Sequence, residues 1–314
     1  MKDTILYGDC RETLCAFLPQ SARVCVTSPP YYGLRNYGGE DSQIGQEQTP
    51  EEFIDELVKV FREVKNVLTD DGTCWVNLGD SYYNYRPGRG QGLAKQTVSN
   101  TKQDLPDVCP RRGNKLEGLK EKDLIGIPWM FAFAMRADGW YLRQDIIWNK
   151  PNPMPESVRD RCTKAHEYIF LFSKNKKYFY DNEAIKEPAK DWGTRDRTNG
   201  KYHNEGSGLA PHSGLTKSYS TKNKRSVWSV TKKPYKGAHF AVFPPDLIEP
   251  CILAGSEKGD IVLDPFMGSG TTAMVAKKLG RHYLGCELHE NYGNLIEERV
   301  LPYENRLEKF FEDS

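Results

Sequence analysis

The chain has 314 residues, of which 38% are apolar and 28% are charged, and its formal net charge is +1. This balance suits one large domain or two small ones with a buried core, and it excludes disorder as the main state of the chain. The longest uncharged apolar run, Trp129 to Met135, is far shorter than the roughly 20 residues that a membrane-spanning helix needs. The net charge by itself does not indicate a nucleic-acid partner.

The N-terminus and the cysteines predict where the protein works. Asp3 and Asp9 interrupt the first apolar residues, so no continuous stretch suits a secretory signal. The eight cysteines are spread along the chain without a Cys-x-x-Cys pair. We therefore expect a soluble cytoplasmic protein with reduced thiols, no metal site and no membrane partner.

Strand-like and helix-like stretches alternate along much of the chain, which is typical of an α/β domain with a mainly parallel, twisted sheet and helices on both faces. Short apolar runs predict strands over residues 22–27, 73–78, 145–148, 167–173, 260–264 and 282–287. Apolar residues at helical spacing predict helices over residues 50–68, 123–135, 244–253 and 271–279.

Two segments, residues 86–122 and 186–236, lack this periodicity, and in both of them basic residues far outnumber acidic ones. Loops of such length inside a compact domain are usually functional or disordered. The residues alone leave open whether these segments bind a partner or act as solvated linkers.

A strand followed by a glycine-rich turn indicates a cofactor site near the C-terminus. The predicted strand 260–264 ends in Asp264 and continues as Pro265-Phe266-Met267-Gly268-Ser269-Gly270-Thr271-Thr272. Ligands bind at the carboxyl ends of parallel strands, and glycine lets the backbone approach them closely. Glu287 ends the next predicted strand, about 20 residues further on, where an acidic side chain can hold the hydroxyls of a ribose.

The details of this turn narrow the choice of cofactor. The third glycine of a dinucleotide fingerprint is missing, and no Gly-Lys-Ser or Gly-Lys-Thr sequence is present for a nucleoside triphosphate. NAD and ATP therefore fit poorly, and the pattern predicts another adenosine-containing cofactor.

A second informative segment, Ser28-Pro29-Pro30-Tyr31, follows the predicted strand 22–27. The two prolines fix the backbone just beyond the strand. The Ser28 hydroxyl and the Pro29 carbonyl can then accept hydrogen bonds from one exocyclic amine, while Tyr31 offers a flat surface for stacking. A base must leave the duplex stack to reach such a site.

Together the two motifs resemble those of the DNA amino-methyltransferases, which transfer the methyl group of S-adenosylmethionine to N4 of cytosine or N6 of adenine. Ser28-Pro29-Pro30-Tyr31 resembles the catalytic motif (D/N/S)PP(Y/F) of this family, and the segment from Asp264 to Gly270 resembles its cofactor motif. The order of the motifs is similar to that of the permuted β group. The resemblance implies a Rossmann-like methyltransferase fold that uses S-adenosylmethionine, with permuted motif order and an inserted target recognition region.

The resemblance also implies a division of the chain and roles for individual residues. Residues 1–185, with the basic insertion 86–122, would form the catalytic half of one domain, residues 186–236 the target recognition insertion, and residues 237–314 the cofactor-binding half. The catalytic residues would be Ser28, Pro29, Pro30 and Tyr31. The cofactor-binding residues would be Asp9, Cys10, Asp264, Phe266, Gly268, Gly270, Thr271 and Glu287. The candidate DNA contacts are Arg195, Arg197, Lys222, Lys224 and Arg225.

The first residue of the catalytic motif bears on the target base. By resemblance, serine is commoner there in the N4-cytosine enzymes, so we expect site-specific transfer to N4 of cytosine in duplex DNA, by base flipping and direct transfer. Adenine N6 is the alternative, because Ser28 can accept a hydrogen bond from either amine. An RNA or protein amino-methyltransferase and a catalytically silent DNA-binding protein are further alternatives. A homodimer and a cognate restriction endonuclease stay open as partners.

Two other classes of enzyme fit less well. A C5-cytosine mechanism needs a cysteine nucleophile, and Cys251, in the only Pro-Cys dipeptide, is predicted to lie buried in a helix. An adenosine-binding oxidoreductase would account for Glu287 and the glycine turn, but it would leave the motif from Ser28 to Tyr31 without a task.

Overall fold

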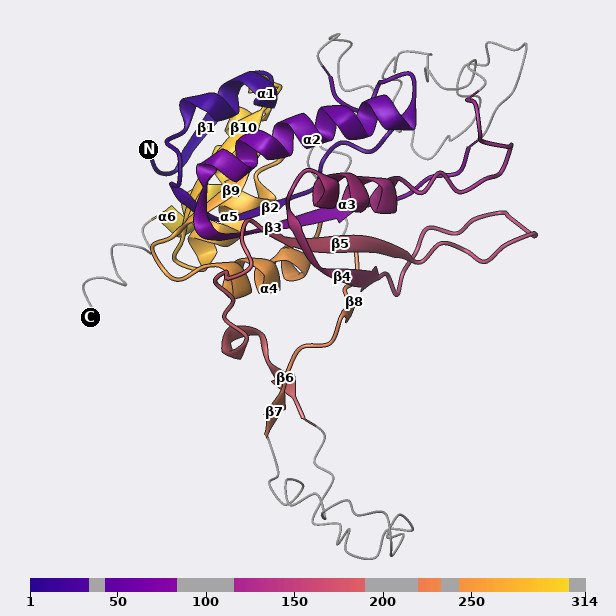
Figure 1. Ribbon diagram of the computed structural model, residues 1–314. Coiled ribbons are helices and arrows are strands. Elements are labelled where there is room, and N and C mark those ends of the chain that lie inside the picture. The colour runs from indigo at the N-terminus through magenta and orange to yellow at the C-terminus, as the bar shows by residue number, and fades with distance from the viewer. Residues whose placement is uncertain (34–42, 84–115, 190–219, 233–242, 305–314) are drawn as a thin grey trace, which may run out of the picture.

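The computed structural model describes residues 1–33, 43–83, 116–189, 220–232 and 243–304 (Figure 1). Within these ranges eight strands form one sheet, in the order β1-β10-β9-β2-β3-β5-β4-β8. They are β1 (Thr4–Tyr7), β2 (Ala22–Thr27), β3 (Leu68–Leu78), β4 (Tyr141–Asn149), β5 (His166–Ser173), β8 (Val227–Ser229), β9 (Ile261–Asp264) and β10 (His282–Glu287). A separate ribbon pairs β6 (Glu187–Pro188) with β7 (Thr221–Lys222).

The α-helices of the described ranges are α1 (Cys10–Thr13), α2 (Pro50–Val67), α3 (Ile127–Ala137), α4 (Pro245–Gly255), α5 (Thr271–Lys278) and α6 (Gly293–Glu304). Short 3-10 turns, η1 (Leu14–Ala16), η3 (Glu183–Ile185) and η4 (Glu290–Tyr292), join some of these elements. No helix in the described ranges is long and apolar enough to cross a membrane.

The sheet is mainly parallel. Strand β5 runs antiparallel to both of its neighbours, β3 and β4, whereas the other neighbouring strands of the sheet are parallel to each other. The carboxyl ends of β1, β10, β9, β2 and β3 therefore lie along one edge of the sheet, where ligands bind in α/β folds. The predicted α/β architecture is confirmed.

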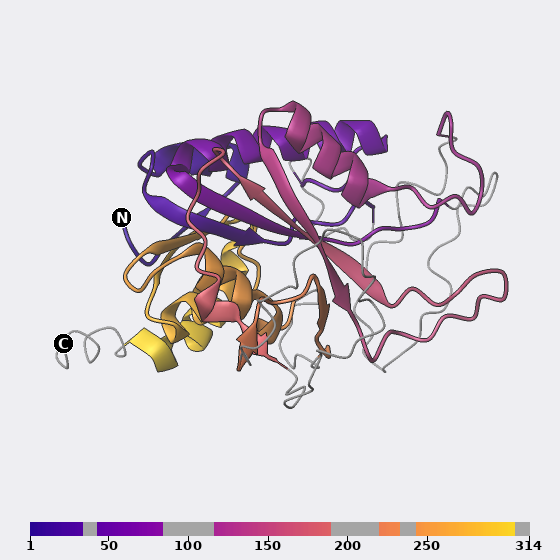
Figure 2. The same cartoon turned by 60° about the horizontal axis from the view of Figure 1, so that its bottom comes forward.

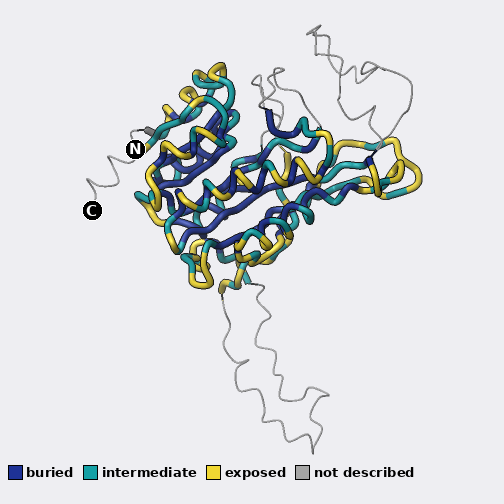
Figure 3. The backbone as a smooth tube through the Cα atoms, turned by 45° about the horizontal axis from the view of Figure 1, so that its top comes forward, coloured by how far each residue is buried: buried dark blue, intermediate teal, exposed yellow. Residues whose placement is uncertain are grey.

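Helices cover both faces of the sheet, with α2 and α3 on one face and α4 and α5 on the other (Figures 1 and 2). Strand β2 contributes side chains to the packing on both faces of the sheet. Val24 and Val26 pack with α4 and α5, whereas Cys25 between them packs with α2 and α3. Successive side chains of a strand point to opposite faces, so the apolar run is buried on both sides. Figure 3 shows this buried interior between the helices.

Helix α2 confirms the predicted helix over residues 50–68 to within one residue. Thr49 accepts a hydrogen bond from the Glu52 backbone and Glu52 bonds back to the Thr49 backbone, a capping box that satisfies two free amides at the start of the helix. Pro50 occupies the first turn, where its missing N–H costs nothing. The apolar stripe, which includes Phe53 and Phe61, is fully buried.

The predicted helix over residues 123–135 is wrong at its start. Helix α3 begins only at Ile127, because Gly126 adopts a left-handed conformation with φ +88°. The amides of Gly126 and Ile127 donate to the carboxylate of Asp80 at 3.0 and 3.2 Å, and this side chain takes the place of a cap from the helix itself. The loop before α3 is thereby tied to the end of β3.

The predicted strands 73–78 and 145–148 are shorter than β3 and β4. Strand β3 already begins at Leu68, where it pairs with Ala22 before a shift in register. The residues Thr69-Asp70-Asp71-Gly72 are polar and typical of a turn, which hides this start in the sequence. Several short or irregular elements, β1, β8 and α6 among them, had no counterpart among the predicted elements.

The two basic segments lie mostly outside the described residues. At the end of the first, Leu116 is buried and its amide donates to the Tyr83 hydroxyl at 2.9 Å, so this end packs on the core. Near the end of the second, β8 pairs with β4 in the main sheet. The division into residues 1–185, 186–236 and 237–314 stays a prediction, and β8 shows that part of the middle segment completes the sheet.

Candidate active site at the carboxyl edge of the sheet

The candidate residues follow four adjacent strands at one edge of the sheet. Asp9 follows β1, Glu287 ends β10, Asp264 ends β9, and Ser28 follows β2. The Gly8 amide donates to the Glu287 carbonyl at 2.9 Å, which extends the pairing of β1 with β10 up to this edge. The fold thus brings the N-terminal and C-terminal motifs together.

Asp264 joins these motifs directly. Its side chain is 1% exposed and accepts hydrogen bonds from the hydroxyls of Thr27 and Thr272, each at 2.6 Å, and from the Phe266 amide at 3.0 Å. Burial raises the pKa of Asp264 to about 6, although these three donors favour the ionised form. The carboxylate therefore fixes the start of the glycine turn to the end of β2. A direct contact of Asp264 with a cofactor stays a prediction.

Two glycines shape the turn between β9 and α5. Gly268 and Gly270 have φ values of +54° and +77°, which L side chains rarely adopt. A Cβ atom on Gly270 would also lie 2.8 Å from Ile296 Cγ2 of helix α6. Arg299 holds the turn from outside, since its guanidinium donates to the Ser269 hydroxyl at 2.6 Å. The backbone amides of this turn are thus held in a fixed arrangement.

Glu287 reaches across from β10 to the same turn. Its carboxylate accepts hydrogen bonds from the Gly268 amide at 2.7 Å and from the His289 amide at 3.0 Å. The residue is 8% exposed, and burial raises the pKa of its carboxyl to about 7. A carboxylate with spare lone pairs next to a glycine turn is suited to accept the hydroxyls of a ribose.

Two polar side chains next to the glycine turn and Glu287 in the sequence have unsatisfied atoms that suit a bound cofactor. Thr271 Oγ1 and His289 Nε2 are buried and have no hydrogen-bond partner among the described residues. Buried polar groups in proteins are nearly always paired, so such atoms point to a missing partner. Together with Glu287 and the glycine turn, they fit a cofactor that carries hydroxyl and amino groups. Phe266, at the start of the turn, is partly buried and packs against the core.

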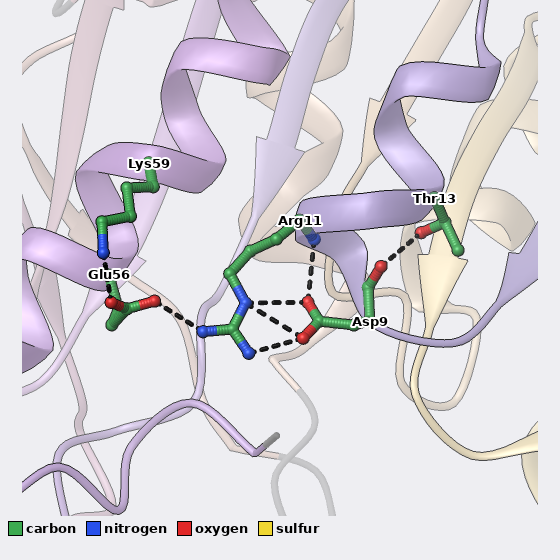
Figure 4. A network of polar contacts seen from close by, with 5 residues as sticks. All are labelled: Asp9, Arg11, Thr13, Glu56 and Lys59. Carbon is green, nitrogen blue, oxygen red and sulfur yellow. Dashed lines mark hydrogen bonds and ion pairs between the residues drawn. The ribbon is translucent and has the colours of Figure 1, made fainter.

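The residues after β1 are engaged within the protein, as Figure 4 shows. Asp9 caps helix α1 by accepting the Arg11 amide at 2.9 Å, and its carboxylate pairs with the Arg11 guanidinium, which also reaches Glu56 of α2 at 2.5 Å. Burial raises the pKa of Asp9, but the hydrogen bonds from Arg11 outweigh it and hold the pKa below its usual value. Cys10 is buried, and burial raises the pKa of its thiol. Cofactor contacts of Asp9 and Cys10 stay predictions.

The catalytic motif follows β2. Ser28 and Pro30 are partly buried and Pro29 is buried. The Tyr31 hydroxyl donates to Glu167 Oε2 of β5 at 2.8 Å and lies 3.3 Å from Asn77 Oδ1 of β3.

The partners of Tyr31 could not be predicted from the sequence, because they come from strands distant in the chain. A polar residue inside the apolar run of β3 was the one available signal for Asn77. Glu167 stands near the start of β5, where a charged residue is ordinary.

Three of the five candidate DNA contacts are described. Lys222 and Arg225 lie 3.6 and 2.6 Å from the same carboxylate oxygen of Glu187, and Lys224 Nζ lies 5.0 Å from the centre of the Trp228 ring. Arg195 and Arg197 lie outside the described residues. Cys251 is buried in α4 as predicted, and burial raises the pKa of its thiol, which does not suit a nucleophile.

The fold is that of methyltransferases whose structures are known. The chain resembles the PvuII DNA methyltransferase (cytosine-N4-specific) with a TM-score of 0.60 at 19% identity, over 98% of this chain and 93% of that one. It resembles TTHA0409 of Thermus thermophilus, solved in complex with S-adenosyl-L-methionine, with a TM-score of 0.56 at 24% identity, over 95% and 92% of the two chains.

In sequence, the chain is 46% identical to the type II methyltransferase M.XycI of Xanthomonas campestris pv. cyanopsidis, over 95% of this chain and 87% of the relative. Residues 22–298 match the N6_N4_Mtase family model, described as DNA methylase. The chain therefore belongs to this family of DNA methyltransferases. The methyl donor predicted from the sequence, S-adenosylmethionine, agrees with the family and with the ligand in the TTHA0409 structure.

The role of Asp264 in joining the two motifs can be tested by its removal. Asp264→Ala leaves the hydroxyls of Thr27 and Thr272 and the Phe266 amide without their acceptor. We expect urea unfolding to show a loss of at least about 3 kcal/mol, since each of the three unsatisfied buried groups costs about 1–3 kcal/mol.

Asp260→Ala, at the other end of the same strand segment, is the matched control. This carboxylate forms a partly exposed pair with Arg23 at 3.4 Å and accepts a hydrogen bond from the exposed Glu257 amide at 2.8 Å, so its loss should cost only about 1 kcal/mol. Equal losses in both variants would contradict the bridging role of Asp264.

Proposed function

We propose that this chain transfers the methyl group of S-adenosylmethionine to the exocyclic N4 amine of cytosine in duplex DNA. The observation that carries the proposal is the bond between Thr27 and Asp264, which sets the segment Ser28-Pro29-Pro30-Tyr31 beside the glycine turn. A motif suited to hold an amine thus adjoins a turn suited to hold an adenosine. Serine at the first motif position, by resemblance, favours cytosine over adenine.

In this proposal the chain holds the target amine rather than reacting with it. The Ser28 hydroxyl and the Pro29 carbonyl accept hydrogen bonds from the amine, and the ring of Tyr31 stacks on the flipped base. Acceptors fixed by two prolines favour the geometry in which the nitrogen lone pair is free to attack, and such preorganised contacts need no covalent intermediate.

The cofactor residues follow from the same geometry. When bound, S-adenosylmethionine would supply a methyl group on a positively charged sulfur. The new N–C bond would form as the S–C bond breaks and leaves its electron pair on sulfur, giving S-adenosylhomocysteine, and the methylated amine would release one proton to water. Glu287 would accept the ribose hydroxyls, while the backbone of Gly268 and Gly270 and the hydroxyl of Thr271 would line the site. Phe266, Asp9 and Cys10 complete the proposed set, and Asp264 would act through the turn that it holds.

The proposed DNA contacts lie in and beside the second basic segment. Lys222, Lys224 and Arg225, together with Arg195 and Arg197, would neutralise phosphates or read bases, and phosphate contacts would make the affinity fall as salt rises. The target recognition role of this segment stays a prediction, as do a homodimer and a cognate restriction endonuclease.

The catalytic motif can be separated from the cofactor site by substitution. Ser28→Ala and Tyr31→Ala should each lower the rate of methyl transfer about 100-fold, as is typical when one preorganised group is removed from a site. Their affinity for S-adenosylmethionine, measured by isothermal titration calorimetry, should stay close to that of the wild type. Either variant turning over like the wild type would refute the catalytic assignment.

Glu287 makes the affinity for the cofactor depend on pH. With a pKa of about 7, its carboxyl is mostly protonated at pH 6 and mostly ionised at pH 8. Only the ionised form accepts both ribose hydroxyls, so the Kd for S-adenosylmethionine should rise about tenfold as the pH falls from 8 to 6.

Glu287→Gln should bind the cofactor more weakly at pH 8 and should lose most of this pH dependence, while its affinity for DNA stays nearly unchanged. A wild-type Kd that is constant between pH 6 and pH 8 would contradict the role of Glu287, and an equal loss of DNA affinity would indicate a folding defect.

A further inference from the structure

A largely buried ion pair between Lys150 and Glu167 contacts the proposed catalytic motif at Tyr31. Glu167 Oε2 accepts the Tyr31 hydroxyl at 2.8 Å, and Glu167 Oε1 pairs with the ammonium of Lys150. The Lys150 Nζ also lies 4.3 Å from the centre of the Trp148 ring. A single carboxylate is therefore held between the phenol of Tyr31 and a cation.

Burial makes this pair costly to maintain. The side chains of Lys150 and Glu167 are 6% and 15% exposed. Replacing a buried ion pair by apolar residues of similar volume often leaves the stability of a fold unchanged or raises it. The proposed cofactor and DNA contacts do not use the pair. Besides the Tyr31 hydroxyl, Glu167 Oε2 accepts a hydrogen bond from Asn77 Nδ2 at 3.4 Å. Burial lowers the pKa of Lys150, and Lys232 lies close enough to lower it further.

The backbone and the ring of Tyr31 are restricted from other sides as well. Pro29 and Pro30 fix the chain just before Tyr31. A Cβ atom built on Gly79 would lie 2.6 Å from Tyr31 Cε2, so the ring edge lies directly against the backbone after β3. Asn77 Oδ1 lies 3.3 Å from the hydroxyl, and Asn77 Nδ2 is held by the Tyr168 carbonyl at 3.0 Å. Both ends of the side chain are thus held.

We propose that Glu167, braced by Lys150, is a positioning residue that holds the ring of Tyr31 in the plane where it stacks on the target base. Reacting groups must be held to about 0.5 Å and 10–20° of the productive geometry, and a ring anchored only at its Cβ atom does not meet that tolerance. The proposal rests on the proposed catalytic role of Tyr31. It does not depend on which base is methylated.

The test removes the brace without leaving a buried charge. Glu167→Leu combined with Lys150→Met replaces the ion pair by apolar side chains, and Tyr31→Phe removes the hydroxyl that the pair holds. The measured quantity is the single-turnover rate of methyl incorporation into mixed-sequence duplex DNA. Since total incorporation counts cytosine and adenine alike, an error in the proposed target base does not affect the result.

We expect the pair replacement and Tyr31→Phe each to lower this rate about 10- to 100-fold, the range that a misplacement of about 1 Å produces. The triple variant should be no slower than the slower of these two variants, because the pair replacement and Tyr31→Phe remove the same hydrogen bond. In these variants the Kd values for S-adenosylmethionine and DNA should stay within about twofold of the wild type. A general loss of structure would weaken binding as well as lower the rate.

The control is Glu249→Leu combined with Lys278→Met, the same pair of substitutions at a more exposed Lys–Glu ion pair, 2.8 Å apart, between α4 and α5. Its rate should stay within about twofold of the wild type. A pair replacement at positions 150 and 167 that keeps the wild-type rate would overturn the proposal. So would losses that multiply when the pair replacement is combined with Tyr31→Phe.

Gly79→Ala keeps the proposal testable if the pair replacement weakens cofactor binding. The new methyl group pushes on the ring of Tyr31 and leaves the ion pair intact. We expect a similar fall in the single-turnover rate with unchanged cofactor affinity, and an unchanged rate would overturn the claim that the orientation of this ring limits methyl transfer.

Discussion

The carboxylate of Asp264 is the contact on which the arrangement of the site depends. It ties the hydroxyl of Thr27 at the end of β2 to the amide of Phe266 and to the hydroxyl of Thr272 in α5. Residues at opposite ends of the sequence are thereby fixed within one buried hydrogen-bond network. The two predicted motifs keep their relative position because a carboxylate with little access to water is held by these three hydrogen bonds.

The two restraints on the site are of different kinds. The proposed cofactor side is held mainly by backbone conformation, through Gly268 and Gly270 in the turn and Glu287 across it. The proposed catalytic side is held by side chains, through the buried pair of Glu167 and Lys150 that meets Tyr31. The proposed transfer needs both restraints, since the amine of a flipped base reacts only if the base and the methyl group are each held in position.

Much of this arrangement could be predicted from the sequence. Runs such as residues 22–27 and 282–287 are rich in apolar residues, which is typical of strands buried on both faces, and both strands were predicted with the bounds that they have. Motifs that follow strand ends could be placed at one edge, because parallel strands share that edge. In the structure Asp9, Ser28, Asp264 and Glu287 end or follow adjacent strands at that edge.

Other features depend on contacts that local patterns do not contain. The start of α3 is set by Asp80, which lies far upstream of Gly126. Strand β8 is short and forms only by pairing with β4. The engagement of Asp9 by Arg11, and that of Tyr31 by Glu167, decide which polar groups are available to a ligand. A spacing rule cannot give such partners, since they come from other elements of the fold.

The most direct test of the account is to identify the methylated base. The protein is incubated with mixed-sequence duplex DNA and S-adenosylmethionine, the DNA is digested to nucleosides, and the products are analysed by mass spectrometry. The account predicts N4-methylcytosine. N6-methyladenine would contradict the proposed target while leaving the fold and the site in place, and the absence of both products would contradict the transfer of a methyl group to a DNA base amine.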